Sequence, residues 1–137
     1  MAITASEVNK LRQITGAGMM DCKNALTESN GDFDAAIDIL RKKGQKVASK
    51  RSDRDASEGV VISKTTGDAT KGVIIMLNCE TDFVARNQEF IDFADAIANA
   101  ALENVPQNVE DLLTLKVQGL AISEKLSEMV GKIGEKI

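Results

Sequence analysis

The chain has 137 residues, of which 43% are hydrophobic and 28% are charged, and its formal net charge is −4 at pH 7. This composition is typical of a globular protein that buries its own core, as one domain or as two small ones. No apolar run approaches the length of a membrane-spanning helix, and the first 25 residues lack an export leader, so we expect no membrane partner. A net acidic chain is also a poor candidate for nucleic-acid binding, because phosphate contacts require cations.

The sequence contains no histidine and only two cysteines, Cys22 and Cys79. It therefore lacks the commonest general base and the commonest metal ligand. The cysteines have no metal-ligand spacing, so we expect buried free thiols in a reducing cytoplasm. The neighbouring Glu80 should raise the pKa of Cys79 and so disfavour a reactive thiolate. We therefore expect a protein that is not an enzyme and that has no cofactor and no metal site.

Three short helices are predicted near the N-terminus. Thr4 and Glu7 have the spacing of a capping box at the start of the first helix. Glycines are expected to end the helices, the first before residues 16–18, the second at residues 30–31 and the third before Gly44. The apolar positions that recur at helical spacing are Val8, Leu11, Ile14, Met19, Cys22, Ala25, Leu26, Phe33, Ala36, Ile37 and Leu40. Such a pattern predicts a minimal three-helix bundle.

A basic segment follows the helices. Residues 41–58 carry seven Lys or Arg against three Asp or Glu, with one large apolar side chain. This composition is typical of a solvated helix or a linker. An RNA-binding arm over residues 41–54 is the alternative, although no aromatic residues alternate with the charges there. We therefore predict a helical N-terminal domain over residues 1–55, with a basic linker from about residue 41.

The remaining residues, 56–137, are predicted to form an α+β core subdomain. Two β-branched runs, residues 59–65 and 71–78, flank a turn-rich interval of hairpin length, which predicts a hairpin over about residues 59–79. The predicted fold class of the chain is thus α+β, with a three-helix bundle, a linker and a β-hairpin packed by helices.

Helices are expected to cover this hairpin. Apolar residues from Phe90 to Leu102 follow the i, i+3, i+4, i+7 pattern, which predicts a helix over about residues 88–104. Pro106 should close it. Further helical patterns predict helices within about residues 109–136, a short one after Asn108 and a last one toward the end.

One aromatic residue, Phe83, lies among polar residues where the second strand leads into the following helix. Its spacing fits two interpretations. Phe83 precedes Phe90 by seven residues, which would place both on one helical face in the core. Alternatively, Phe83 projects outward from a strand-to-helix corner as a wedge for a partner. Spacing alone leaves both interpretations open.

Met19 and Met20 raise a similar question. Adjacent helical residues are about 100° apart, so the two side chains do not point at the same part of the core. Both could still lie at the edge of a small core, or they could form an adaptable contact surface for a partner.

Two longer segments closely resemble bacterial translation elongation factor Ts. They are Thr15-Gly16-Ala17-Gly18-Met19-Met20-Asp21-Cys22-Lys23 and Thr81-Asp82-Phe83-Val84-Ala85-Arg86-Asn87. Both occur in the order and separation found in that family, and the resemblance runs over the whole chain. Family members continue past this length, so we expect an N-terminal portion with a truncated core subdomain. The resemblance also implies a ubiquitin-associated-like fold for the helical domain.

The resemblance implies a guanine-nucleotide exchange factor of protein synthesis that binds elongation factor Tu in its GDP form. In the family, Asp82 and Phe83 would enter beside the nucleotide and displace its Mg²⁺, and this outward role favours the wedge interpretation of Phe83. Two sets of residues would support them. The displacing segment is completed by Thr81 and Val84 and flanked by Arg86 and Asn87, and the docking face on the partner's GTPase domain comprises Leu11, Arg12, Met19 and Met20. The alternative is a helical adaptor that binds a protein through residues 1–44 without affecting nucleotide.

Overall fold

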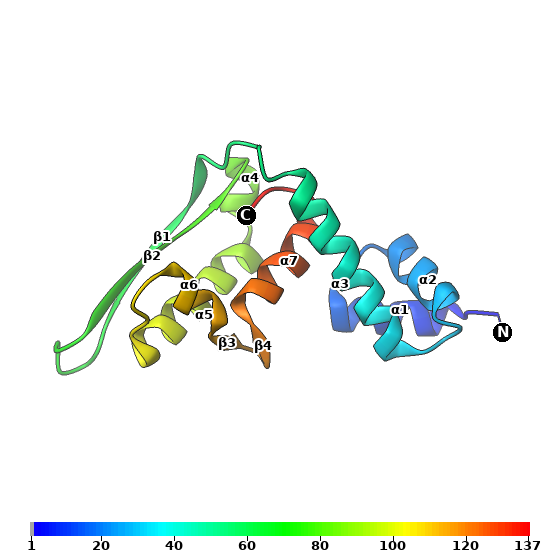
Figure 1. The fold of residues 1–137 in the computed structure, drawn as a ribbon, viewed down its shortest axis with the longest axis horizontal. Helices are drawn as coiled ribbons and strands as arrows, with labels where there is room; N and C mark the ends of the chain where they lie inside the picture. Colours follow the sequence, from blue (N-terminus) through cyan, green and yellow to red (C-terminus); the bar gives the residue numbers. More distant parts are fainter. Residues whose placement is uncertain (1) are drawn as a thin grey trace. The chain divides into compact units, whose positions relative to one another are not determined.

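The computed structural model describes residues 2–137, which divide into two units (Figure 1). The first unit contains the described residues up to Ser52 together with Ser127–Gly134, and the second contains Asp53–Leu126 and Glu135–Ile137. The last helix, α7 (Ile122–Ile133), therefore contributes residues to both units. Each unit is described by itself.

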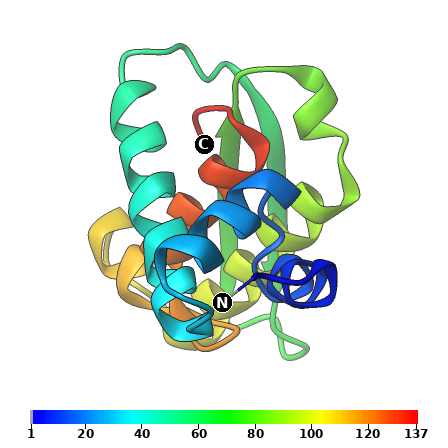
Figure 2. The ribbon, with the colours of Figure 1, turned by 90° about the vertical axis from the view of Figure 1, so that its right-hand side faces the viewer.

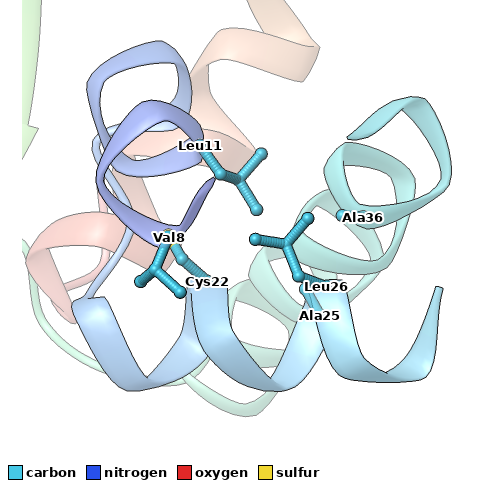
Figure 3. Packing of buried hydrophobic residues seen from close by; sticks show 6 residues of the cluster. All are labelled: Val8, Leu11, Cys22, Ala25, Leu26 and Ala36. Atoms are coloured by element: carbon cyan, nitrogen blue, oxygen red, sulfur yellow. The ribbon is translucent and has the colours of Figure 1, made fainter. Parts of the chain in front are cut away.

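Three helices form most of the first unit: α1 (Ala5–Thr15), α2 (Met19–Glu28) and α3 (Phe33–Lys50). The three pack against one another, and Figure 2 shows them in dark blue to teal. Their buried core is formed by Val8, Leu11, Cys22, Ala25, Leu26 and Ala36. In Figure 3, Leu11 of α1 and Leu26 of α2 point toward each other in this core. The predicted three-helix bundle is confirmed.

The start of α1 is fixed by the predicted capping box. The Glu7 amide donates to Thr4 Oγ1 at 3.3 Å, and the Thr4 amide donates to the Glu7 carboxylate at 2.8 Å. These bonds satisfy two amides that a helix start leaves without partners. The helix ends at Gly16, whose φ of 68° lies in the left-handed region.

The prediction that the third helix ends before Gly44 is wrong, because α3 continues to Lys50. Gly44 is buried in the helix interior, and a Cβ atom there would lie 2.6 Å from the backbone oxygen of Ser127 in α7. Glycine therefore serves a close approach between two helices here, and it does not mark a helix end. As a result, residues 41–50 of the basic segment are helical.

The second unit is built on an antiparallel hairpin of β1 (Glu58–Thr65) and β2 (Gly72–Cys79). The helix α5 (Gln88–Asn104) runs beside both strands, as Figure 1 shows. Its buried side chains are Phe90, Phe93, Ala94, Ile97, Ala98, Ala100 and Ala101. The α+β fold class and the helix over residues 88–104 are confirmed.

The chain after α5 differs from the predicted helices within residues 109–136. A short helix, α6 (Val109–Thr114), is followed by two-residue strands, β3 (Lys116–Val117) and β4 (Leu120–Ala121), before α7 begins. The turn between β3 and β4 uses Gln118 and Gly119 at φ 54° and 83°. Positive φ at both central residues is the geometry of a tight hairpin turn, which a search for helical spacing misses.

The turn between β1 and β2 predicts a measurable titration. Asp68 Oδ1 accepts hydrogen bonds from Thr66 Oγ1 at 2.6 Å, from Thr70 Oγ1 at 2.8 Å and from the Thr70 amide at 3.1 Å. The Thr66 hydroxyl and then the two Thr70 donors lower the pKa of Asp68 from 3.8 to about 2. Because the pKa is lower in the folded state, the contribution of this carboxylate to stability is complete above the unfolded value and is lost as the pH falls through the folded one.

We expect the carboxyl carbon of Asp68 to titrate near pH 2 when it is followed by NMR. Thr66→Ala should raise its pKa toward 3.8, because this change removes the hydroxyl that lowers it most. A wild-type titration near pH 4 would contradict the turn geometry.

Candidate functional site

The corner that joins β2 to α5 comprises residues 79–87. It contains a single-turn helix, α4 (Asp82–Ala85). Side chains of the corner cap the N-termini of both α4 and α5. Thr81 Oγ1 accepts from the Val84 amide at 3.4 Å at the start of α4. Asn87 Oδ1 accepts from the Glu89 amide at 2.9 Å at the start of α5. Thr81 and Asn87 thus act as N-caps, the positions where such side chains satisfy helix amides.

The structure excludes the core interpretation of Phe83, whose side chain is 82% exposed. The seven-residue spacing to Phe90 requires one continuous helix, whereas α4 ends at Ala85 and α5 begins at Gln88. The interruption changes the helical phase, so Ala85 is buried while Phe83 faces solvent. A phenyl ring this exposed is available for contact with a partner.

The neighbouring carboxylate is also accessible. The Asp82 side chain is 48% exposed, and its Oδ2 lies 3.5 Å from Arg86 Nη2 one helical turn away. An exposed ion pair of this kind contributes little free energy. Asp82 can therefore exchange Arg86 for another positive group at small cost. Val84, the next residue of the motif, is half-buried.

An acidic residue that we did not predict holds the start of the corner. Glu135 Oε2 accepts hydrogen bonds from the amides of Glu80 and Thr81, both at 3.0 Å, and Glu135 Oε1 accepts from Thr81 Oγ1 at 2.6 Å. In return, the Lys136 amide donates to Glu80 Oε1 at 2.7 Å. We call this set of bonds among Glu80, Thr81, Glu135 and Lys136 the corner brace. No local sequence signal joins positions 54 to 56 residues apart.

Cys79 lies at the base of the corner and is fully buried. Burial raises the pKa of its thiol most, and the negative charges of Glu135 and Glu58 raise it further. The predicted direction is confirmed, but the cause is not the adjacent Glu80. A raised pKa keeps the thiol protonated and disfavours nucleophilic chemistry. Cys22 is buried as well, and both cysteines are free thiols, as predicted.

The residues expected to form a docking face lie on α1 and α2 of the first unit. Met19 is 51% exposed and Met20 is 64% exposed, so neither belongs to the core. Arg12 is exposed too. Leu11 does not fit this expectation, because it is fully buried in the helical core. Ile14 is exposed instead, which corrects its assignment to the apolar face of the helix.

Among residues 2–137, no group of three or more His, Cys, Asp or Glu side chains is arranged to hold a metal ion. None of the helices in this part of the chain is long and apolar enough to cross a membrane.

Comparison with known proteins finds relatives that match nearly the whole chain. The family model described as Elongation factor TS matches residues 80–137, which include most of the corner and the whole brace. Elongation factor Ts of Christiangramia forsetii is 60% identical over 135 residues, covering 98% of this chain and 48% of that protein. Elongation factor Ts of Amoebophilus asiaticus is 54% identical over 137 residues, covering 100% of this chain and 50% of that protein. The chain thus spans about half the length of the curated relatives it matches, and over nearly all of its own length it is similar to proteins named elongation factor Ts.

Proposed function

We propose that this chain binds elongation factor Tu in its GDP form and accelerates the release of GDP. The observation that carries the proposal is the exposed Phe83 ring on a capped, single-turn helix, with the accessible Asp82 carboxylate beside it. The relatives named above are elongation factors, and the residues that the family model matches include the Thr81–Asn87 segment. The function needs no covalent step by the chain's own side chains, so we propose a binding protein and not an enzyme.

Phe83 supplies the apolar part of the interaction. Burying a phenylalanine side chain that was exposed to water stabilises a complex by about 1.5–3 kcal/mol. Aromatic anchors in fully desolvated pockets often dominate the binding energy of an interface. The ring can therefore displace a packed element of the partner, and the half-buried Val84 is its neighbour in the same segment.

Asp82 supplies the electrostatic part. A guanine nucleotide is held with Mg²⁺, which takes oxygen ligands in a nearly ideal octahedron and tolerates little displacement. In the proposal, the Asp82 carboxylate enters this region beside Phe83 and disturbs the coordination. Thr81 caps the segment, and Arg86 and Asn87 flank it.

The docking face in this proposal comprises Arg12, Ile14, Met19 and Met20. Their apolar members are exposed, and methionine side chains adapt to the shape of a partner surface. Leu11 is left out of the face because of its burial.

Coupling between the two ligands must be reciprocal. If the chain weakens GDP binding by a given factor, GDP weakens binding of the chain by the same factor. Each factor of ten corresponds to about 1.4 kcal/mol of coupling free energy. The chain thereby accelerates nucleotide exchange. Which nucleotide the partner then binds is set by its own affinities and by the nucleotide concentrations.

The test is the rate at which elongation factor Tu releases fluorescent GDP. The unmodified chain should accelerate release, and Phe83→Ala should reduce the acceleration by about tenfold or more, in line with the loss of an aromatic anchor. Asp82→Ala should also reduce it. Val109→Ala is the matched control, because Val109 is an exposed apolar residue of the same unit outside the corner. If Phe83→Ala and Asp82→Ala accelerate release as well as the unmodified chain, the wedge proposal is wrong.

A helical adaptor without exchange activity is the second candidate, favoured by the exposed Ile14, Met19 and Met20 of the first unit. Under this alternative, a Met19→Ser, Met20→Ser double variant loses affinity for elongation factor Tu, while the chain leaves GDP release unchanged. Calorimetric titration together with the release assay distinguishes the two functions.

A further inference from the structure

The direction in which the Phe83 side chain points depends on the backbone that carries it. Its side chain is 82% exposed, so side-chain packing contributes little to its orientation. The helix that carries it, α4, has four residues. A single helical turn has little stability of its own, because nucleation costs more than one hydrogen bond returns. The orientation of Asp82 and Phe83 must therefore be fixed from outside α4.

The corner brace is placed to do this. The Glu135 carboxylate accepts three hydrogen bonds, from the amides of Glu80 and Thr81 at 3.0 Å each and from Thr81 Oγ1 at 2.6 Å. Hydrogen bonds to an ionised group are shorter and stronger than neutral ones. Both amides come directly before Asp82, so the bonds fix the backbone at the point where α4 begins.

Thr81 links the brace to the helix. Its hydroxyl donates its proton to Glu135 Oε1, and the same oxygen accepts from the Val84 amide at 3.4 Å. Donation to an ionised acceptor polarises the Thr81 hydroxyl, and the hydroxyl oxygen then becomes a stronger acceptor for the Val84 amide. The carboxylate thus acts on the N-cap of α4 as well as on the preceding backbone.

The segment that carries Glu135 is itself tied to the second unit. The Lys136 amide donates to Glu80 Oε1 at 2.7 Å, and Lys136 Nζ donates to the backbone oxygen of Arg54 at 2.9 Å. Lys136 therefore attaches both to the corner, at Glu80, and to the segment ahead of β1, at Arg54. Both the corner and the segment that carries Glu135 are thus fixed by hydrogen bonds, and a functional site needs such supporting contacts to keep its geometry.

From this geometry we propose that Glu135 is a positioning residue, whose carboxylate fixes the orientation of Asp82 and Phe83 before a partner binds. Its importance for GDP release rests on the proposed function, whereas its effect on the corner can be measured in the free chain. A preorganised contact avoids the entropy cost of ordering the corner during association. Loss of the brace should weaken exchange without removing any residue that touches the partner.

The first experiment measures amide hydrogen exchange by NMR in the complete chain with Glu135→Gln. We expect the protection of the Glu80 and Thr81 amides to fall about tenfold, as the loss of charge-assisted hydrogen bonds predicts, while the β1–β2 ladder keeps its protection. Glu103→Gln is the matched control, because Glu103 is an exposed carboxylate on α5, in the same unit but away from the corner. Unchanged protection of both corner amides in Glu135→Gln would overturn the proposal.

The second experiment separates positioning from general stability. Glu135→Gln should reduce the acceleration of GDP release about tenfold when Phe83 is present, and it should add little in a Phe83→Ala background, since residues that act as one unit are non-additive. An equal reduction in both backgrounds would assign Glu135 a merely structural role and overturn the proposal. If the unmodified chain does not accelerate release at all, the proposed function fails, and amide exchange alone decides the role of Glu135.

Discussion

Replacing Phe90 by alanine should lower the free energy of unfolding of the second unit by about 3–5 kcal/mol, the usual cost of truncating a buried phenylalanine. Phe90 is fully buried on α5, the helix that packs against both strands of the hairpin. Because a small domain has a total stability of only about 5–15 kcal/mol, this one substitution removes a large part of it. Urea-induced unfolding followed by circular dichroism measures the change.

Phe83→Ala is the matched control for Phe90→Ala, since it deletes the same ring from the same unit. Phe83 is 82% exposed, so its truncation should change the unfolding free energy by about 0.5 kcal/mol or less. The two variants should therefore behave in opposite ways: Phe90→Ala destabilises the fold, and Phe83→Ala affects GDP release. Similar losses of stability in both would contradict the placement of the two rings.

Gly44→Ala should destabilise the first unit, although helix propensity alone predicts the reverse. Alanine in place of glycine in a helix interior normally gains about 0.5–1 kcal/mol. At Gly44 the added Cβ would lie 2.6 Å from the Ser127 backbone oxygen and force α3 and α7 apart. Overpacking of this kind typically costs about 1–3 kcal/mol, which outweighs the propensity gain.

Thermal unfolding tests this prediction, because Gly44→Ala should lower the midpoint temperature whereas helix propensity alone would raise it. Gln45→Ala is the control, because Gln45 is the exposed neighbour on the same helix and should stay within about 0.5 kcal/mol of the unmodified chain. A higher midpoint temperature for Gly44→Ala would mean that α7 does not lie against this position.

Local signals in the sequence predicted the elements that depend on local physics. The capping box at Thr4 and the apolar stripe that starts at Phe90 each involve residues within one or a few helical turns, so their spacing is enough to predict a helix. Gly44 was misread because glycine both ends helices and permits close helix contacts, and only the position of α7 distinguishes the two. The strands β3 and β4 have two residues each, too few for an alternating pattern.

The candidate site also combines features that local sequence predicts with features that depend on distant contacts. The Thr81–Asn87 motif was visible in the sequence, but the exposure of Phe83 depends on a break between α4 and α5 that its seven-residue spacing to Phe90 does not reveal. The burial of Leu11 depends on how three helices pack together. Glu135 was missed because its partners are 54 and 55 residues away, beyond the reach of any local pattern.

The corner brace also has a consequence for the order of folding. Contacts between neighbouring helices, such as α1 with α2, close short loops and form early, whereas the bond from Thr81 to Glu135 closes a loop of 54 residues. During synthesis, the hairpin, α4 and α5 are all made before Glu135 is added to the chain. We therefore expect the corner to be the last part of the second unit to become fixed. A nascent or partly unfolded chain would then carry the Phe83 motif without presenting it in the bound orientation.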